Sequence, residues 1–184
     1  MENVDIDAHK FILLIHKFIM KIAILSDIHD NFNNLEKSLK EIKKSQCDII
    51  IFCGDFGGPA IAKKLAEAKL KTYAVFGNVD GAVYEITTYF KENAPHVTLF
   101  RDMGFIEIDN KKIAFCHYPE FAEGLAHTGK YDVVFHGHTH IPDSKKIKNT
   151  LLCCPGEIIG YKTGKVTFGI FDTKTSQFVI KEVQ

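Results

Sequence analysis

Residues 21–31 read KIAILSDIHDN and contain a pattern that returns along the rest of the chain. The run Lys21–Ser26 is mostly apolar and is followed by turn-forming residues, which is typical of a short buried strand. Asp27 and His29 come directly after this run, and both side chains can bind a metal ion. The regular part of the sequence therefore begins with a buried strand that ends in potential ligands.

Strands and helices are expected to alternate through the first half of the chain. Asn31 or Asn33 is a suitable N-cap for the first helix. This β-α order predicts a parallel sheet with right-handed crossovers, whose functional loops gather at the carboxyl ends of the strands. The expected strands are Lys21–Ser26, Asp48–Cys53 and Lys71–Phe76, and the expected helices are Asn33–Ser45, Pro59–Ala68 and Ala82–Asn93.

In the second half of the sequence, a hairpin and antiparallel strands are expected in place of the regular β-α alternation. Gly104–Asp109 and Lys111–His117 flank Asn110 and predict a hairpin, and Phe121–Gly129 predicts a helix. These elements favour an α/β sandwich of two packed sheets with helices outside. A buried strand is expected at Asp132–His136, and antiparallel strands are expected at Lys145–Cys153, Lys165–Asp172 and Gln177–Val183.

Potential metal ligands follow five of these strands. Each one alone has an ordinary explanation, because an Asp after a strand often caps a helix and a lone His is often a packed side chain. Five strand ends that draw on one set of ligand types are much harder to obtain by chance. The residues are Asp27 and His29, Asp55, Asn78 and Asp80, His117, and finally His136, His138 and His140.

A mixed set of nitrogen and oxygen ligands indicates which ions could bind. Such a set suits Mn²⁺, Fe²⁺, Ni²⁺, Zn²⁺ or Co²⁺ and contains too much nitrogen for Ca²⁺ or Mg²⁺. Two such ions about 3.5–4 Å apart can clamp a phosphoryl group during in-line displacement. Arg101 is the only arginine, so phosphate chemistry here would depend on metal ions rather than on guanidinium groups.

Composition narrows the class of protein further. The chain has 184 residues, 46% of them hydrophobic, and the 23 basic residues balance the 23 acidic ones. This net charge of zero gives no general attraction to nucleic acid or to an anionic membrane. The five cysteines are odd in number and form no C-x-x-C motif, so we expect reduced thiols in a cytoplasmic protein.

Residues 1–19 are expected to be an extension that precedes a single domain at residues 20–184. The apolar run Phe11–Ile15 is too short to span a bilayer, and no secretory signal pattern is present. An amphipathic helix is the alternative interpretation, because several apolar residues of this segment fall on one helical face.

The motifs D-x-H, G-D, G-N-x-D, H and G-H-x-H occur in this order from Asp27 to His140. This order resembles the calcineurin-like metallophosphoesterase superfamily, and in particular its compact bacterial and archaeal phosphodiesterase subfamily. The resemblance extends from about Met20 to the C-terminus. It implies a four-layer αββα sandwich, in which two mixed β-sheets are flanked by helices, and a dinuclear metal site.

The resemblance also implies roles for individual residues. Two divalent transition-metal ions are expected, with Mn²⁺ as the first choice and Ni²⁺, Zn²⁺, Fe²⁺ or Co²⁺ as alternatives. The residues expected to take part in catalysis are Asp55, Asn78 and His117, and the resemblance makes each of them a metal ligand as well. Asp27, His29 and His140 would hold the first ion, Asn78, His117 and His138 would hold the second, and Asp55 would bridge the two.

The sequence departs from the family pattern at several positions. Many members have a histidine where this chain has Val79, and valine cannot protonate a leaving group. Asp80 would normally hold that histidine, so here it is expected to cap the helix that begins near Ala82. Tyr118 follows His117 in place of glycine and could narrow the pocket or stack on a substrate. His136 has no ligand role in the pattern, and Glu157 stands where the subfamily has a serine.

The resemblance implies a hydrolase that cleaves phosphodiesters, with some monoesters as further substrates, by attack of a hydroxide that bridges two metal ions. A small phosphate ester is the expected substrate, and the oligomeric state, including a homo-oligomer, is left open. The alternative is a non-enzymatic scaffold like the small subunit of the retromer coat, which resembles the same subfamily. A nuclease of the double-strand-break type is disfavoured, because no additional DNA-binding segment is present.

Overall fold

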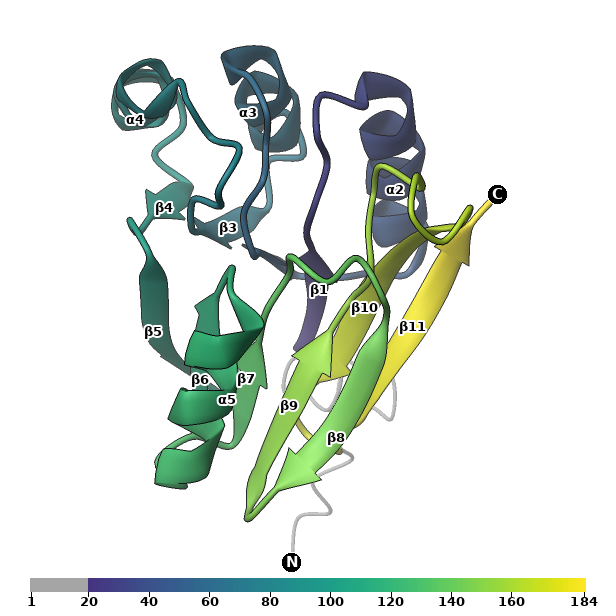
Figure 1. The fold of residues 1–184 in the computed structure, drawn as a ribbon. Helices are drawn as coiled ribbons and strands as arrows, with labels where there is room; N and C mark the ends of the chain where they lie inside the picture. The colour runs from purple at the N-terminus through teal and green to yellow at the C-terminus, as the bar shows by residue number, and fades with distance from the viewer. Residues whose placement is uncertain (1–19) are drawn as a thin grey trace, which may run out of the picture.

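The computed structural model describes residues 20–184 as two β-sheets packed between layers of helices (Figure 1). The predictions for residues 1–19 lie outside the described residues. The helices are α2 (Phe32–Lys44), α3 (Pro59–Ala66), α4 (Val83–Asn93) and α5 (Pro119–Thr128). The strands are β1 (Lys21–Leu25), β2 (Ile49–Phe52), β3 (Lys71–Ala74), β4 (Val97–Leu99), β5 (Met103–Ile108), β6 (Lys111–Cys116), β7 (Val133–Phe135), β8 (Asp143–Ile147), β9 (Thr150–Cys154), β10 (Val166–Asp172) and β11 (Phe178–Val183).

The first sheet has six strands in the order β11-β10-β1-β2-β3-β4. Strands β1 to β4 are parallel, and β10 and β11 extend the sheet with antiparallel pairing on the other side of β1. The second sheet has the order β5-β6-β7-β9-β8, with β6, β7 and β9 parallel and the two edge strands antiparallel. Both sheets are therefore mixed, as the resemblance implies.

Three apolar layers hold the sheets and helices together. Alternate residues of β1 face opposite sides: Ile22 and Ile24 pack between the two sheets, whereas Ala23 and Leu25 pack under helices α2, α3 and α4. Helix α5 covers the outer face of the second sheet. Figure 1 shows α5 on the opposite side of the molecule from the other three helices. The predicted four-layer αββα sandwich is confirmed.

Local signals in the sequence account for several element boundaries. The Asn31 side chain accepts a hydrogen bond from the Asn34 backbone N–H and so caps α2. Pro59 and Pro119 open α3 and α5 from the first turn, where a missing N–H costs nothing. Gly129 ends α5 with φ of +67°, a conformation that glycine adopts readily.

Two features of the fold differ from the sequence-based expectation. Residues 145–153 do not form one strand, because the chain reverses at Lys148, whose φ is +52°, and separates β8 from β9. The second of these strands then pairs in parallel with β7. Strand β4, which has only three residues, was not expected because so short a segment shows no periodicity.

Candidate metal centre

The predicted ligands meet at one edge of the sandwich, where parallel strands of both sheets end. Strands β1, β2 and β3 of the first sheet lead into the loops of Asp27, Asp55 and Asn78. Strands β6 and β7 of the second sheet lead into those of His117 and His138. The site therefore lies between the two sheets and takes side chains from both.

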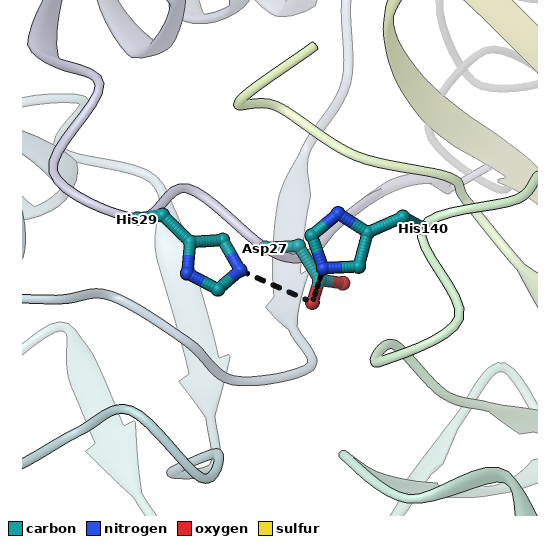
Figure 2. A group of neighbouring side chains, drawn as sticks. All are labelled: Asp27, His29 and His140. Carbon is teal, nitrogen blue, oxygen red and sulfur yellow. Dashed lines mark ion pairs between the residues drawn. The ribbon is translucent and has the colours of Figure 1, made fainter. Parts of the chain in front are cut away.

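Asp27, His29 and His140 form the first cluster (Figure 2). The Asp27 Oδ1 atom lies 3.2 Å from His140 Nε2 and 3.7 Å from His29 Nε2. Figure 2 shows dashed lines that join a nitrogen of each imidazole ring to this same oxygen. The three side chains thus direct one oxygen and two nitrogen atoms toward a common point.

Asn78, His117 and His138 form the second cluster. The Asn78 Oδ1 atom lies 2.9 Å from His117 Nε2 and 2.8 Å from His138 Nδ1, and the two nitrogen atoms are 3.2 Å apart. The His117 Nδ1–H group donates to the backbone oxygen of Cys53 at 2.9 Å, which leaves Nε2 facing the cluster. Asn78 and His138 are exposed, whereas His117 is buried, so the cluster opens toward solvent on one side.

Asp55 lies between the two clusters. Its Oδ2 atom is 3.4 Å from His29 Nε2 and 3.3 Å from His117 Nε2. Its Oδ1 atom accepts a hydrogen bond of 3.0 Å from the Val79 backbone N–H. A single carboxylate oxygen therefore faces both clusters while the other fixes the orientation of the group.

The buried polar atoms of the site fit a divalent cation. Among the described residues, the Asp27 Oδ1 and His29 Nε2 atoms are buried without a hydrogen-bond partner. A buried carboxylate oxygen that lacks a partner is costly in free energy, and a cation at this point would compensate it. The donor set of carboxylate, amide and imidazole groups agrees with the transition-metal ions expected from the sequence.

The charges of the site shift several pKa values. The Asp27 carboxylate raises the pKa of His29, against burial and with a smaller contribution from Asp55. Burial disfavours the charged form of His117, but the Asp55 carboxylate outweighs this effect and raises its pKa. Burial also disfavours ionised Asp55, yet His117 and the Val79 N–H lower its pKa overall. The cluster therefore attracts positive charge, whether protons or metal ions.

The backbone at the ligands is unusual. Five ligands have φ in the left-handed region, which few non-glycine residues adopt. Hydrogen bonds between neighbouring loops hold this conformation, including those from Ile28 N–H to the Asp55 oxygen and from Gly137 N–H to the His117 oxygen. Such backbone strain is commonly found where side chains must converge on one point. The five residues are Asp27, His29, Asp55, His138 and His140.

Asp80 does not cap a helix, and the expectation that it would is wrong. Helix α4 begins after Ala82 without a side-chain cap. The Asp80 carboxylate instead accepts hydrogen bonds from the backbone N–H groups of Gly77, Asp55 and Gly57 at 2.7, 3.1 and 3.1 Å. Burial raises the pKa of Asp80, although these N–H groups oppose the shift. Asp80 thus joins the loop after β3 to the loop that carries Asp55.

His136 and Tyr118 lie beside the clusters rather than within them. The His136 side chain is buried and its Nδ1–H group donates to the Gly137 oxygen at 2.9 Å. The Tyr118 ring lies 5.2 Å from the rings of both His117 and His138, measured between centroids. It also contacts the half-exposed ring of Phe121, so aromatic surface borders the second cluster.

Glu157 belongs to the site and was not expected there. Its side chain is fully buried, and its Oε2 atom lies 2.6 Å from His140 Nδ1. Burial disfavours the ionised carboxylate, but the bonds from His140 and from Thr163 lower the pKa of Glu157. A charged residue between a Pro155–Gly156 turn and the apolar pair Ile158–Ile159 is the only sequence signal that could have indicated it.

The cysteines do not supply a nucleophile. All five are free and buried, as the sequence suggests. Burial raises the pKa of Cys116 to about 12 and that of Cys154 to about 11. These thiols remain protonated at neutral pH and act as small apolar side chains.

The four-layer sandwich and the two ligand clusters define a hydrolase whose chemistry depends on divalent metal ions. The chain belongs to the calcineurin-like phosphoesterase superfamily, whose domain matches residues 20–176. Two relatives described below are named phosphodiesterases, which agrees with the donor set described above. Within residues 20–184, no helix is both long enough and apolar enough to cross a membrane.

Several characterised proteins are similar to this chain over most of its length. Phosphodiesterase MJ0936 of Methanocaldococcus jannaschii is 32% identical over 161 residues, which cover 86% of this chain and 96% of that protein. Phosphodiesterase YfcE of Escherichia coli is 24% identical over 168 residues, covering 83% and 88% respectively. A solved structure of an archaeal phosphodiesterase has a TM-score of 0.83 at 31% identity and covers 89% of this chain and 100% of its own.

Proposed function

We propose that this metal-dependent phosphoesterase hydrolyses phosphodiesters, and some monoesters, at a centre of two divalent ions. The observation that carries the proposal is the position of Asp55, whose Oδ2 atom lies within 3.4 Å of a histidine from each cluster. A carboxylate oxygen in this position can serve two cations at once. The family and the named relatives support the same reaction class.

The ligand roles follow from the two clusters. Asp27, His29 and His140 would hold the first ion, Asn78, His117 and His138 would hold the second, and Asp55 would contact both. Two bound divalent ions would lower the pKa of a water molecule and neutralise charge on the phosphate. Mn²⁺ is our first choice for both ions, with Ni²⁺, Zn²⁺, Fe²⁺ and Co²⁺ as alternatives.

The chain's own residues support a preference for diesters. The exposed side of the second cluster, at Asn78 and His138, is where a substrate can approach. Arg101, the only arginine, has an almost fully exposed side chain. Its Nε atom lies 3.9 Å from Asp102 Oδ2, so its charge is already paired with a carboxylate. A dianionic monoester would gain more from a guanidinium clamp than a monoanionic diester does.

The substrate and surroundings of the protein are also part of the proposal. We expect a small phosphate ester rather than nucleic acid or a membrane, because the net charge is zero and the chain has a single arginine. The five free thiols support a cytoplasmic location. The oligomeric state, including a homo-oligomer, is left to direct measurement.

Hydrolysis of bis-p-nitrophenyl phosphate and p-nitrophenyl phosphate tests the proposal. Metal-stripped protein would be assayed with Mn²⁺, Ni²⁺, Zn²⁺ or Mg²⁺ added back. We expect metal-dependent cleavage that is faster for the diester. The Asp55→Asn variant should lose activity by at least about 100-fold, because the shared ligand loses its charge.

Retained turnover in Asp55→Asn would contradict the assignment of a shared ligand. Absence of cleavage with every metal, in protein shown to be folded, would favour the scaffold alternative. Every predicted ligand side chain is present at the site within residues 20–184, which supports the enzyme rather than the scaffold.

A further inference from the structure

The His140 imidazole lies between two buried carboxylates. Its Nε2 atom is 3.2 Å from Asp27 Oδ1, inside the first cluster, and its Nδ1 atom is 2.6 Å from Glu157 Oε2, outside the cluster. Asp27 and Glu157 are both fully buried. The ring therefore connects the first cluster to a carboxylate that itself makes no contact with the other ligands of that cluster among the described residues.

The hydrogen bonds of Glu157 fix which nitrogen of His140 carries the proton. Besides His140, the carboxylate accepts bonds from the Thr163 N–H at 2.7 Å, from the Thr163 hydroxyl at 2.8 Å and from the Lys162 N–H at 3.2 Å. An ionised carboxylate can only accept, so His140 must donate from Nδ1. In the neutral imidazole, which is the form that binds a metal ion, the lone pair of Nε2 then faces Asp27 Oδ1. Two acceptors directed at each other leave a position suited to a cation.

His117, the buried histidine of the second cluster, is held differently. His117 donates from Nδ1 to the neutral backbone oxygen of Cys53. A charged acceptor makes an imidazole a more basic ligand than a neutral carbonyl does, and it also fixes the orientation of the ring more strongly. The contact with Glu157 therefore concerns the first cluster specifically.

We propose that Glu157 is a positioning residue that holds His140 in the ligating tautomer and strengthens the binding of a divalent cation at Asp27, His29 and His140. The inference rests on the proposed two-ion function. It adds a residue from the loop between β9 and β10, a segment that carries none of the proposed ligands.

A purely structural role for Glu157 is the competing explanation, because the same carboxylate anchors the loop through Lys162 and Thr163. The Glu157→Gln variant keeps the size of the side chain and removes its charge. The Thr163→Ala variant removes one bond between the loop and Glu157 without altering the contact with His140. Comparison of these two variants separates cation binding from loop anchoring.

Calorimetric titration of metal-stripped full-length protein with Mn²⁺ is the decisive measurement. We expect two binding events in the unmodified protein, and a loss of about 10–100-fold in affinity for one of them in Glu157→Gln, with the other unchanged. Thr163→Ala should bind as the unmodified protein does. The inference would be overturned if Glu157→Gln bound Mn²⁺ as tightly as the unmodified protein. It would also be overturned if Glu157→Gln and Thr163→Ala weakened Mn²⁺ binding equally.

The same Mn²⁺ titration distinguishes a failure of the proposed two-ion function from a failure of the proposed role of Glu157. If the unmodified protein binds no Mn²⁺, the two-ion function fails and the inference with it. If it binds two ions and Glu157→Gln does so with the same affinities, only the role of Glu157 is refuted.

A second measurement needs no variant of Glu157. Two-bond ¹H–¹⁵N correlation spectra of the metal-free protein at about pH 8 report the tautomer of each neutral imidazole. We expect His140, assigned by comparison with His140→Gln, to carry its proton on Nδ1. A neutral His140 ring with its proton on Nε2 alone would contradict the inference, even if Glu157→Gln failed to fold.

Discussion

Val79 contributes to the site through its main chain rather than through its side chain. Its backbone N–H holds Asp55 Oδ1 at 3.0 Å, while its side chain is 41% exposed and carries no proton to donate. Residue 79 therefore still orients the Asp55 carboxylate through its backbone, but its side chain cannot act as a general acid. A leaving group with a high pKa has to take its proton from water, which slows its departure.

A histidine at this position should change the range of substrates. Val79→His keeps the backbone N–H and adds a proton donor beside Asn78, so we expect faster hydrolysis of alkyl phosphate esters, by up to about 100-fold. Esters of p-nitrophenol, whose leaving group needs no proton, should change little. Steady-state rates for both ester types would measure this, and an equal change for both would contradict the argument.

Asp80 and Glu157 show where interpretation of single residues from sequence reaches its limit. Both are buried carboxylates whose partners lie far away in the chain or are main-chain N–H groups. A motif identifies the residue types that bind ions, but the acceptors of backbone N–H groups are determined by how loops pack. All seven proposed ligands could be named from the sequence, whereas the contacts that give Asp80 and Glu157 their supporting roles could not be predicted from it.

At the scale of elements, the turn after β7 brings the two sheets close together. The His138 backbone N–H donates to Asp27 Oδ2, at the end of β1 in the other sheet, at 3.1 Å. A Cβ atom at Gly137 would collide with Ser26 Oγ and lie 2.8 Å from Asp27 Oδ2. The backbone of the loop after β7 therefore passes directly against the end of β1, and only glycine permits this approach.

Gly137→Ala should separate the loops that carry the ligands. We expect a loss of about 1–3 kcal/mol in the free energy of unfolding, together with weaker metal binding, because Asp27 and His138 must move apart. Denaturant unfolding of metal-stripped protein would measure the first effect. Gly124→Ala is the matched control: it lies inside α5 with open space around it and should add about 0.5–1 kcal/mol. Equal stability of the two variants would refute the argument.

The elements that sequence patterns predicted correctly are those with a strong periodic signal. Strands β2 and β7 are uninterrupted apolar runs, and β1 and β3 are buried after their first residue. The hairpin of β5 and β6 has Asp109 and Asn110 at its turn. Strands β8 and β9 were merged, because the exposed residues of β8 resemble a loop and Lys148 is not a typical turn residue. Pairing with β7 depends on tertiary packing, which periodicity does not report.

At the scale of the whole molecule, the site joins two sheets whose facing surfaces pack through apolar side chains. Four proposed ligands follow strands of the first sheet, namely Asp27, His29, Asp55 and Asn78. The other three, His117, His138 and His140, follow strands of the second sheet. Bound ions would therefore tie the sheets together and stabilise the protein by mass action, by about 2.7 kcal/mol at a metal concentration 100 times the Kd.

The stability of the metal-free protein should fall as pH rises from about 6 to about 8. The pKa values of His29 and His117 are raised in the folded protein. Their stabilising contribution is complete below the unfolded pKa and is lost as pH rises through the folded values. Denaturant midpoints across this range would measure the fall, and Asp55→Asn, which removes the carboxylate that raises the pKa of His117, should flatten it.

Metal-loaded protein should show the opposite trend over the same range. Protons compete with metal ions for the imidazole nitrogen atoms, so the ions bind more tightly as pH rises. A metal-free protein whose midpoint rises between about pH 6 and about pH 8 would contradict the pKa directions described here.

Removal of residues 1–19 should leave hydrolysis unchanged. Every proposed ligand lies beyond Met20, and the family domain matches residues 20–176. Activity and circular dichroism of the truncated protein would check this prediction. Loss of folding on truncation would show that the segment belongs to the core.

The placement of β10 beside β1 has a consequence for how the protein is made. Strand β1 leaves the ribosome before all the other described strands, but its antiparallel partner, β10, follows only after β2 to β9. A nascent chain that ends after His140 already contains every proposed ligand, yet its first sheet is still open along β1 and Glu157 has not been synthesised. Pairing between such distant segments is slow to form. We therefore expect metal capture to be a late step of biogenesis that follows the docking of the C-terminal strands.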